Sequence, residues 1–149
     1  MASIIKANQL QDFGGNSILT SDGAGNVTVN AAAMKMTPAF EAHLSADQSV
    51  SDAVLTKAEV DIEVFDTDNC YDNTTNYRFT PNVAGKYFVY AKVCLSGSAD
   101  ASVRDIQTRI YKNGTSYANT DFRYDNNDIA RGSPVTIAII EMNGTTDYL

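Results

Sequence analysis

Apolar and polar residues alternate along most of this chain from residue 38 onward. Two early segments show the pattern clearly, one over residues 40–44 and the other over residues 60–64. Side chains of a β-strand point alternately to opposite faces, so period-two alternation predicts strands with one buried and one solvated face. The predicted buried sets are Phe40, Ala42 and Leu44 in the first strand, and Val60, Ile62 and Val64 in the second.

Residues 87–95 form the longest apolar run of this kind. Every second residue from Tyr87 to Leu95 is apolar, and the opposite face still carries Phe88 and Tyr90. A strand that is apolar on both faces is typical of the middle of a structure. We expect this strand to be central and covered on both sides.

Turn signals separate the later strands. Ile106, Thr108 and Ile110 alternate with polar residues before Asn113-Gly114, a dipeptide that favours the positive φ angles of a two-residue hairpin. A further apolar strand, residues 135–139, leads to a second Asn-Gly at 143–144. Short strands at near-regular spacing, with almost no helical periodicity, predict an all-β fold, an antiparallel sandwich or jelly roll.

Residues 1–36 have a different texture. Glycines punctuate short apolar pieces at residues 3–5, 17–20 and 26–30, and Ser21-Asp22-Gly23 is typical of a turn. Strands this short expose as much edge as they bury, so we expect this segment to need identical chains or a larger partner. Residues 31–36 are predicted to connect it to a domain spanning 37–149.

Composition narrows the class of protein. The chain has 149 residues and a formal charge of -7, with no basic stripe, which argues against nucleic-acid binding. No apolar run approaches the roughly 18 residues of a membrane-spanning helix, so we expect no membrane insertion. The first 25 residues lack a basic start followed by an apolar run, and we therefore expect no secretory signal.

Candidate chemistry is sparse. His43 is the only histidine, and no nucleophile motif or acid pair accompanies it, so we expect a solvated surface histidine in a protein that is not an enzyme. Cys70 and Cys94 lack zinc-site spacing; they are predicted to be free and buried, with a single bridge between them as the open alternative.

Calcium is the one cofactor for which the sequence contains candidate ligands. The segment Asp66 to Asp72 places oxygen ligands at alternating positions, but Cys70 and Tyr71 stand where a calcium loop has an oxygen ligand and a glycine. A second acidic stretch, 121–128, is a further source of ligands. We expect these Asp and Asn side chains to close turns instead.

A set of aromatic, proline and glycine residues carries a family resemblance. The set is Phe40, Tyr77, Phe79, Pro81, Gly85, Tyr87 and Phe88. Over residues 38–149 it resembles the globular head of complement component one-q, a relative of the tumour necrosis factor jelly roll. Pro81 suits a loop, and Gly85 suits a tight backbone before the aromatic strand. The resemblance implies a homotrimer, with Phe88 and Tyr90 as candidate trimer contacts.

The chain departs from that family at its last residues. Residues 146–149 resemble the start of a further strand, at the point where family members continue with another hairpin. We expect either that the last strands are missing from this chain or that a partner covers the exposed edge.

The glycine-rich residues 3–30 resemble attachment or shaft segments of bacteriophage fibre proteins. The combination implies a trimeric, non-enzymatic virion protein of a tailed phage, a tail fibre or a head-surface fibre. The protein would then be part of the virion, which assembles in the host cytoplasm. Residues 1–36 would bind another virion protein, and the jelly roll would contact a host receptor. Two alternatives stay open: a capsid decoration protein without receptor role, and a secreted glycan- or protein-binding module, in a version with or without calcium.

Overall fold

A computed structural model describes residues 7–30, 38–99, 102–125 and 128–149. The described residues form β-strands, turns and loops, which confirms the all-β, antiparallel class. Among them, no helix has the length and apolar character needed to cross a membrane. The predicted strand at 3–5 and the connector at 31–36 lie outside the described residues.

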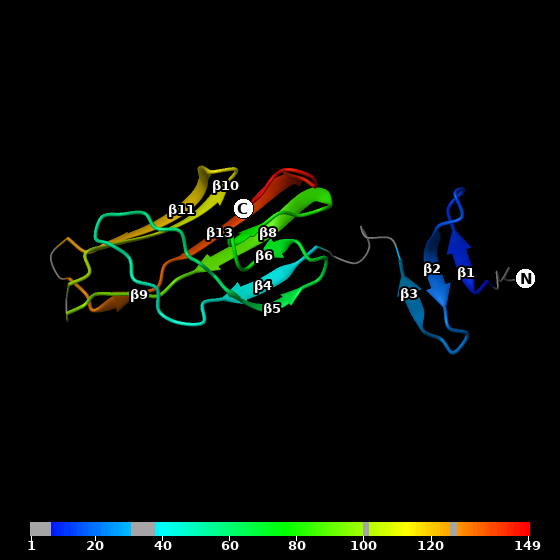
Figure 1. The fold of residues 1–149 in the computed structure, drawn as a ribbon, viewed down its shortest axis with the longest axis horizontal. Helices are drawn as coiled ribbons and strands as arrows, with labels where there is room; N and C mark the ends of the chain where they lie inside the picture. Colours follow the sequence, from blue (N-terminus) through cyan, green and yellow to red (C-terminus); the bar gives the residue numbers. More distant parts are fainter. Residues whose placement is uncertain (1–6, 31–37, 100–101, 126–127) are drawn as a thin grey trace, which may run out of the picture.

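The described residues contain thirteen strands. Figure 1 shows how they are arranged in space. They are β1 (Gln9–Gln11), β2 (Ser17–Ser21), β3 (Val27–Val29), β4 (Phe40–His43), β5 (Ile62–Asp66), β6 (Tyr71–Asp72), β7 (Arg78–Phe79), β8 (Ala84–Lys92), β9 (Leu95–Ser96), β10 (Asp105–Lys112), β11 (Thr115–Arg123), β12 (Arg131–Gly132) and β13 (Val135–Asn143).

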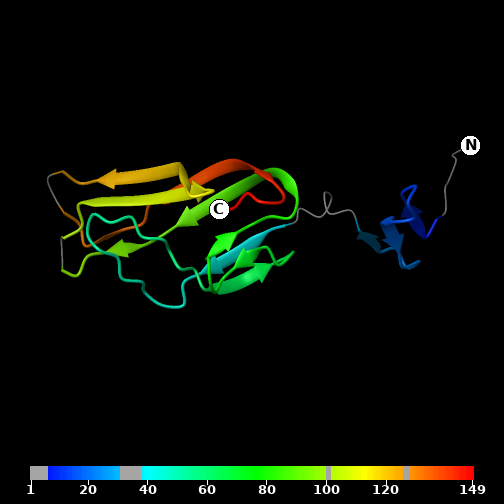
Figure 2. The same ribbon diagram turned by 45° about the horizontal axis from the view of Figure 1, so that its top comes forward.

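The first three strands form a separate antiparallel sheet in the order β1-β2-β3. Leu10, Leu19 and Val29 lie opposite one another across the three strands and give the sheet one apolar row. Leu10 nevertheless stays exposed, and Figure 2 shows this sheet apart from the other strands. The predicted strands at 17–20 and 26–30 are thereby confirmed, and β1 is an additional one.

The remaining strands form a sandwich, which we call the head. Its strand pairs are β4-β5, β6-β7, β8-β13, β9-β12 and β10-β11. Phe40 of β4 stacks on Tyr71 of β6 and on Phe79 of β7, with ring centroids 4.5 and 4.7 Å apart. Tyr87 of β8 also meets Phe79, at 5.7 Å, and Ile110 of β10 packs with Ile140 and Met142 of β13. The pairs β4-β5 and β8-β13 thus face the pairs β6-β7 and β10-β11.

The core between these layers has two parts. One contains Cys70, Tyr71 and Phe79, and the other contains Ile110, Ile140 and Met142. Tyr87 and Leu149 pack against both parts and so join them. Thr136 adds a polar link, because its hydroxyl donates to the Thr108 carbonyl oxygen at 2.9 Å, which satisfies a buried hydroxyl.

The predicted buried set of the second early strand is confirmed for Val60, which packs against the core, and is wrong for Ile62 and Val64 in β5. Val64 is 57% exposed and Ile62 is also exposed, whereas Phe40 and Ala42 of β4 do pack on the core. The cause is a β-bulge: Glu41 pairs with Phe65 while Ala42 pairs with Glu63, so Val64 is an extra residue. A bulge breaks the alternation and turns the following side chains to the other face.

The prediction that β8 is central and covered on both sides is also wrong for the single chain. Strand β8 pairs only with β13 among the described strands, in an unbroken nine-residue register from Ala84–Asn143 to Lys92–Val135. Tyr87 and Val89 face the core, as expected, while Phe88 and Tyr90 are exposed. In β13 the buried set is Thr136, Ile140 and Met142.

The predicted hairpin at Asn113-Gly114 is confirmed, with both residues at positive φ between β10 and β11. The residues after β13 return to this turn. The Asn113 amide N–H donates to the Tyr148 carbonyl oxygen at 3.0 Å, and Leu149 exchanges two backbone hydrogen bonds with Phe79. Tyr148 and Leu149 thus lie between β7 and the β10–β11 turn.

Gly85 does not have the tight backbone that the sequence suggested. It lies inside β8, opposite Met142, and a Cβ atom there would come no closer than 4.0 Å to Tyr87. The glycine that the backbone does require is Gly144. Its φ is +72°, and a Cβ atom would lie 2.3 Å from the Ala84 nitrogen.

The substitution Gly144→Ala should destabilise the head more than Gly114→Ala. Both glycines have positive φ, which costs an alanine about 1–2 kcal/mol. At Gly114 the added methyl meets only the Tyr148 hydroxyl at 3.6 Å, whereas at Gly144 it overlaps backbone and adds about 1–3 kcal/mol. Urea unfolding of the two variants measures the difference; equal losses of stability would contradict this account.

Candidate functional site

The outer side of the β8-β13 pair carries a cluster of exposed apolar side chains, which we call the apolar face. Its members are Phe88 (69% exposed), Tyr90 (57%), Ile137 (55%) and Ile139 (66%). Phe88 pairs with Ile139 and Tyr90 with Ile137, so the four side chains are cross-strand neighbours. Contiguous exposed apolar side chains are typical of surfaces that bind a partner.

Charged residues bound the apolar face at one end. Lys86 lies opposite Glu141 in the same register, one pair beyond Tyr87–Ile140. The sequence singled out Phe88 and Tyr90 on this strand, but it missed Ile137 and Ile139. Only the register of β8 against β13 brings the two pairs together.

The outer side of β4-β5 adds to the exposed apolar surface of the same layer. Ile62, Val64 and Phe65 of β5 are exposed; Ile62 lies opposite His43, Phe65 lies opposite Glu41, and Val64 is the extra residue of the bulge. His43 is exposed there, which agrees with the expected surface histidine. One layer of the sandwich therefore presents apolar side chains on both of its strand pairs.

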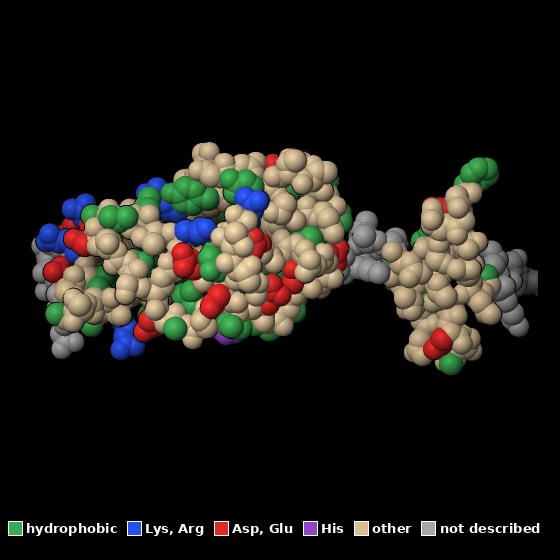
Figure 3. All heavy atoms as spheres, in the orientation of Figure 1, with side chains coloured by type: hydrophobic (Ala, Val, Ile, Leu, Met, Phe, Trp, Pro, Cys, Tyr) green, Lys and Arg blue, Asp and Glu red, His purple; other side chains and the backbone are tan. Residues whose placement is uncertain are grey.

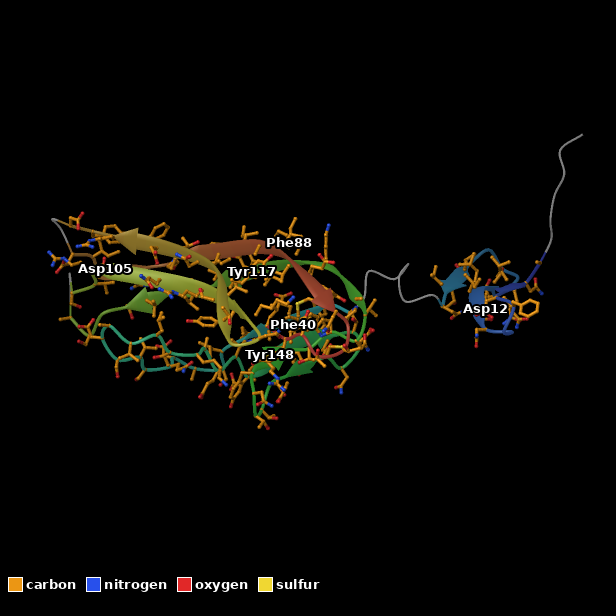
Figure 4. The ribbon with its side chains drawn as sticks, turned by 90° about the horizontal axis from the view of Figure 1, so that it is seen from above. Asp12, Phe40, Phe88, Asp105, Tyr117 and Tyr148 are labelled. Atoms are coloured by element: carbon orange, nitrogen blue, oxygen red, sulfur yellow. The ribbon has the colours of Figure 1, made fainter. Side chains whose placement is uncertain are left out.

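Most of the residues that carry the family resemblance lie in the interior instead. Phe79 stacks on Phe40 and meets the ring of Tyr87 edge-on at 5.7 Å, and Pro81 is fully buried. Figure 4 shows Phe40 within the head. These side chains hold the two layers together, and of the whole set only Phe88 projects its ring outward.

Tyr77 has a separate, local role. Its φ is +48°, an uncommon value for an aromatic residue, and the Lys57 ammonium lies 5.3 Å from its ring centroid. Lys57 also donates to the Asn76 carbonyl oxygen at 3.0 Å. Tyr77 thus ties the long 44–61 loop to the turn before β7.

The acidic residues considered for calcium close turns. Asp66 accepts the Tyr71 amide N–H at 2.7 Å, and Asp72 accepts the amides of Thr74, Thr75 and Asn76. Those backbone hydrogen bonds, with Thr75 foremost, lower the pKa of the Asp72 carboxyl. Within the described ranges, no three His, Cys, Asp or Glu side chains are grouped to hold a metal ion. Residues 126–127 of the second acidic stretch lie outside those ranges.

The two cysteines differ from each other. Both are free, and Cys70 is buried, as predicted, whereas Cys94 is exposed, so the expectation of burial is wrong for Cys94. Burial raises the pKa of the Cys70 thiol. The open alternative of a bridge between them is contradicted by the structure.

Two features were missed from the sequence. In the N-terminal sheet, Asp12 and Asp22 each accept hydrogen bonds from an Asn four residues later, at 2.6–3.1 Å, and so close the turns before β2 and β3. The ten-residue spacing of this Asp-x-x-x-Asn pattern is the signal that would have found them. The second feature is the outer face of β10-β11, where polar side chains pair across the strands.

Comparison with known proteins gives no match. No family model, no curated protein and no solved structure matches this chain. The geometry of the exposed faces is therefore the ground for any statement on function.

Tyr71 should make the head sensitive to alkali. Its hydroxyl donates to the Val60 carbonyl oxygen at 2.8 Å, and burial raises its pKa from 10 to about 12. The unfolded chain then ionises first, so the stabilisation is complete below pH 10 and is lost as pH rises toward 12. Urea unfolding across this range should show a steeper loss in the wild type than in Tyr71→Phe. Parallel curves would refute the assignment.

Proposed function

We propose that this protein is a trimeric structural component of a tailed-phage virion, a tail fibre or a head-surface fibre. It has no catalytic role in this proposal. Residues 1–36 attach it to another virion protein, and the head, a jelly-roll domain of the complement one-q type, faces outward and contacts the host surface. The virion, assembled in the host cytoplasm, is its location.

The apolar face is the observation that supports the trimer. Phe88, Tyr90, Ile137 and Ile139 stand on one rigid strand pair, and the single chain leaves them open to water. A second copy offers the same side chains, so identical chains can cover one another around a symmetry axis. Three copies bring three such faces together at one axis.

The free energies of burial and of association indicate how much apolar surface a stable trimer needs to bury. Burying four large apolar side chains contributes about 6–12 kcal/mol per copy at most, at about 1.5–3 kcal/mol each. Association costs about 4–15 kcal/mol in lost freedom. The apolar face alone therefore supports weak association, and the exposed set Ile62, Val64 and Phe65 on β5 supplies apolar surface to strengthen it.

The small N-terminal sheet supports the attachment role. Its strands have three to five residues, and its side chains are exposed or half-buried. A sheet of this size gains little from burying its own residues, so contact with a partner would stabilise it. The apolar row Leu10, Leu19 and Val29 gives that partner a surface to cover.

Light scattering after size exclusion should show a trimer at micromolar concentration. Phe88→Asp and Ile139→Asp place charges on the apolar face and should each yield monomers, because a carboxylate buried at the interface would be unpaired. Tyr117→Asp, at a similarly exposed aromatic on β11, is the matched control and should remain trimeric. A monomeric wild-type protein would remove the basis of the proposal.

Deleting residues 1–30 should leave the head folded and abolish incorporation into particles. The pairs β1-β2-β3 share no ladder with strands of the head, so the head keeps its own strand pairing. Circular dichroism and melting check the fold, and immunoblotting of purified particles checks incorporation. Particles that carry the truncated protein at normal copy number would show that attachment lies elsewhere.

A further inference from the structure

The outer face of β10-β11 is a ladder of paired polar side chains, which we call the polar face. Its cross-strand pairs are Asp105–Arg123, Gln107–Asp121 and Arg109–Asn119. Tyr111 and Tyr117 follow toward the turn, where a bulge after Ile110 sets Tyr111 opposite Ser116. The alternate residues Ile106, Thr108 and Ile110 are buried, so the polar set points away from the core.

Hydrogen bonds along each strand hold these groups in place. The Arg109 Nη2 donates to Gln107 Oε1 at 2.7 Å, and the Asn119 Nδ2 donates to Asp121 Oδ2 at 3.1 Å. The Arg109 Nε is enclosed by protein atoms and has no acceptor among the described residues. A group fixed by its neighbours before binding loses less entropy when a ligand arrives.

The composition of the face is neutral and rich in both donors and acceptors. Two carboxylates, two guanidinium groups and two amides occupy its three pairs. Equal numbers of acids and bases leave no net charge to attract a nucleic acid or a strongly charged peptide. Sugar hydroxyls, which donate and accept at once, match alternating carboxylates, amides and guanidinium groups.

Aromatic rings at the turn end of the polar face can stack on the apolar side of a sugar ring, which is the second kind of contact that sugar-binding sites use. Tyr117 is 52% exposed and Tyr111 is also exposed, so a flat apolar ring surface is open to the C–H side of a pyranose. At the other end, Asp105, Gln107, Asp121, Phe122 and Arg123 line a hollow of about 230 Å³. This is below the roughly 300–1,000 Å³ of pockets for drug-sized ligands, which suits one ring of a longer chain.

The length of the ladder favours an oligosaccharide over a single sugar. From Asp105 to Tyr111 the strand advances six residues, about 20 Å at about 3.4 Å per residue. Figure 4 shows Asp105 near one end of the head and Tyr117 closer to its middle. Figure 3 shows acidic and basic side chains interspersed at that same end.

The polar face lies on the opposite side of the sandwich from the apolar face. The inner sides of β10-β11 and β8-β13 meet in the core through Ile110, Ile140 and Met142. Their outer sides therefore point in opposite directions. An assembly that covers the apolar face leaves the polar face open to a ligand.

The geometry points to the polar face as a binding site for a neutral or mixed-charge oligosaccharide, bound along the ladder with one ring in the hollow and another on the tyrosines. Expecting that sugar on a bacterial surface rests on the proposed function. The site itself rests on the residues of β10 and β11.

The test uses the full chain on an array that carries purified bacterial O-antigen and capsular polysaccharides beside purified outer-membrane proteins. The wild type should bind at least one polysaccharide. Asp121→Ala removes an acceptor in the hollow and Tyr117→Ala removes the ring surface, and each should weaken binding about tenfold. Asp52→Ala, at an exposed aspartate in the 44–61 loop, is the matched control and should bind as the wild type does.

Melting temperature and light scattering accompany each variant, so that a lost fold or lost assembly is not mistaken for a lost site. Absence of polysaccharide binding, binding that both variants retain in full, or binding to outer-membrane proteins alone would each overturn the inference. If the protein is a trimer but binds no polysaccharide, the proposed binding site is refuted and the proposed function is not. If the protein is a monomer but binds a polysaccharide, the proposed trimer is refuted and the proposed binding site is not.

Discussion

The nine-residue pairing of β8 with β13 is the constraint on which the rest of the head depends. Because strand side chains alternate, one register places Tyr87, Val89 and Ile140 in the core and leaves the apolar face outside. A slip of one residue would exchange the two sets and bury a glutamate or a lysine. Tyr87 also meets Phe79 of the other layer, so the same register fixes how the two layers join.

The two outer sides of the sandwich differ in chemistry for a physical reason. The β8-β13 and β10-β11 pairs each bury their inner side in the core between the layers. Neither pair therefore needs apolar residues on its outer side in order to fold. The β10-β11 hairpin has polar outward residues apart from its two tyrosines, as expected for a strand pair that faces water. The β8-β13 pair instead carries Phe88 and Ile139, whose exposure contributes nothing to the folding of the single chain and is the basis of the proposed trimer.

The N-terminal sheet relies on its turns more than on a core. Asp12 and Asp22 close the loops before β2 and β3 with side-chain hydrogen bonds, and those bonds lower the pKa of both carboxyls. Similar contacts hold Asp72 in the head. Turns of this kind fix the chain path without burying surface, which agrees with the proposal that a partner covers the apolar row of this segment.

The sequence by itself determined what depends on near neighbours. It specified the all-β class, the hairpin at Asn113-Gly114 and the buried set of β10, because turn dihedrals and strand alternation are local. The tertiary structure alone decided which residues meet across strands. The bulge that exposes Val64, the pairing of Leu149 with Phe79, and the meeting of Phe88 with Ile139 all follow from register between segments that are apart in the sequence. Register depends on long-range packing, and a single extra residue reverses a face, so alternation in one strand cannot reveal it.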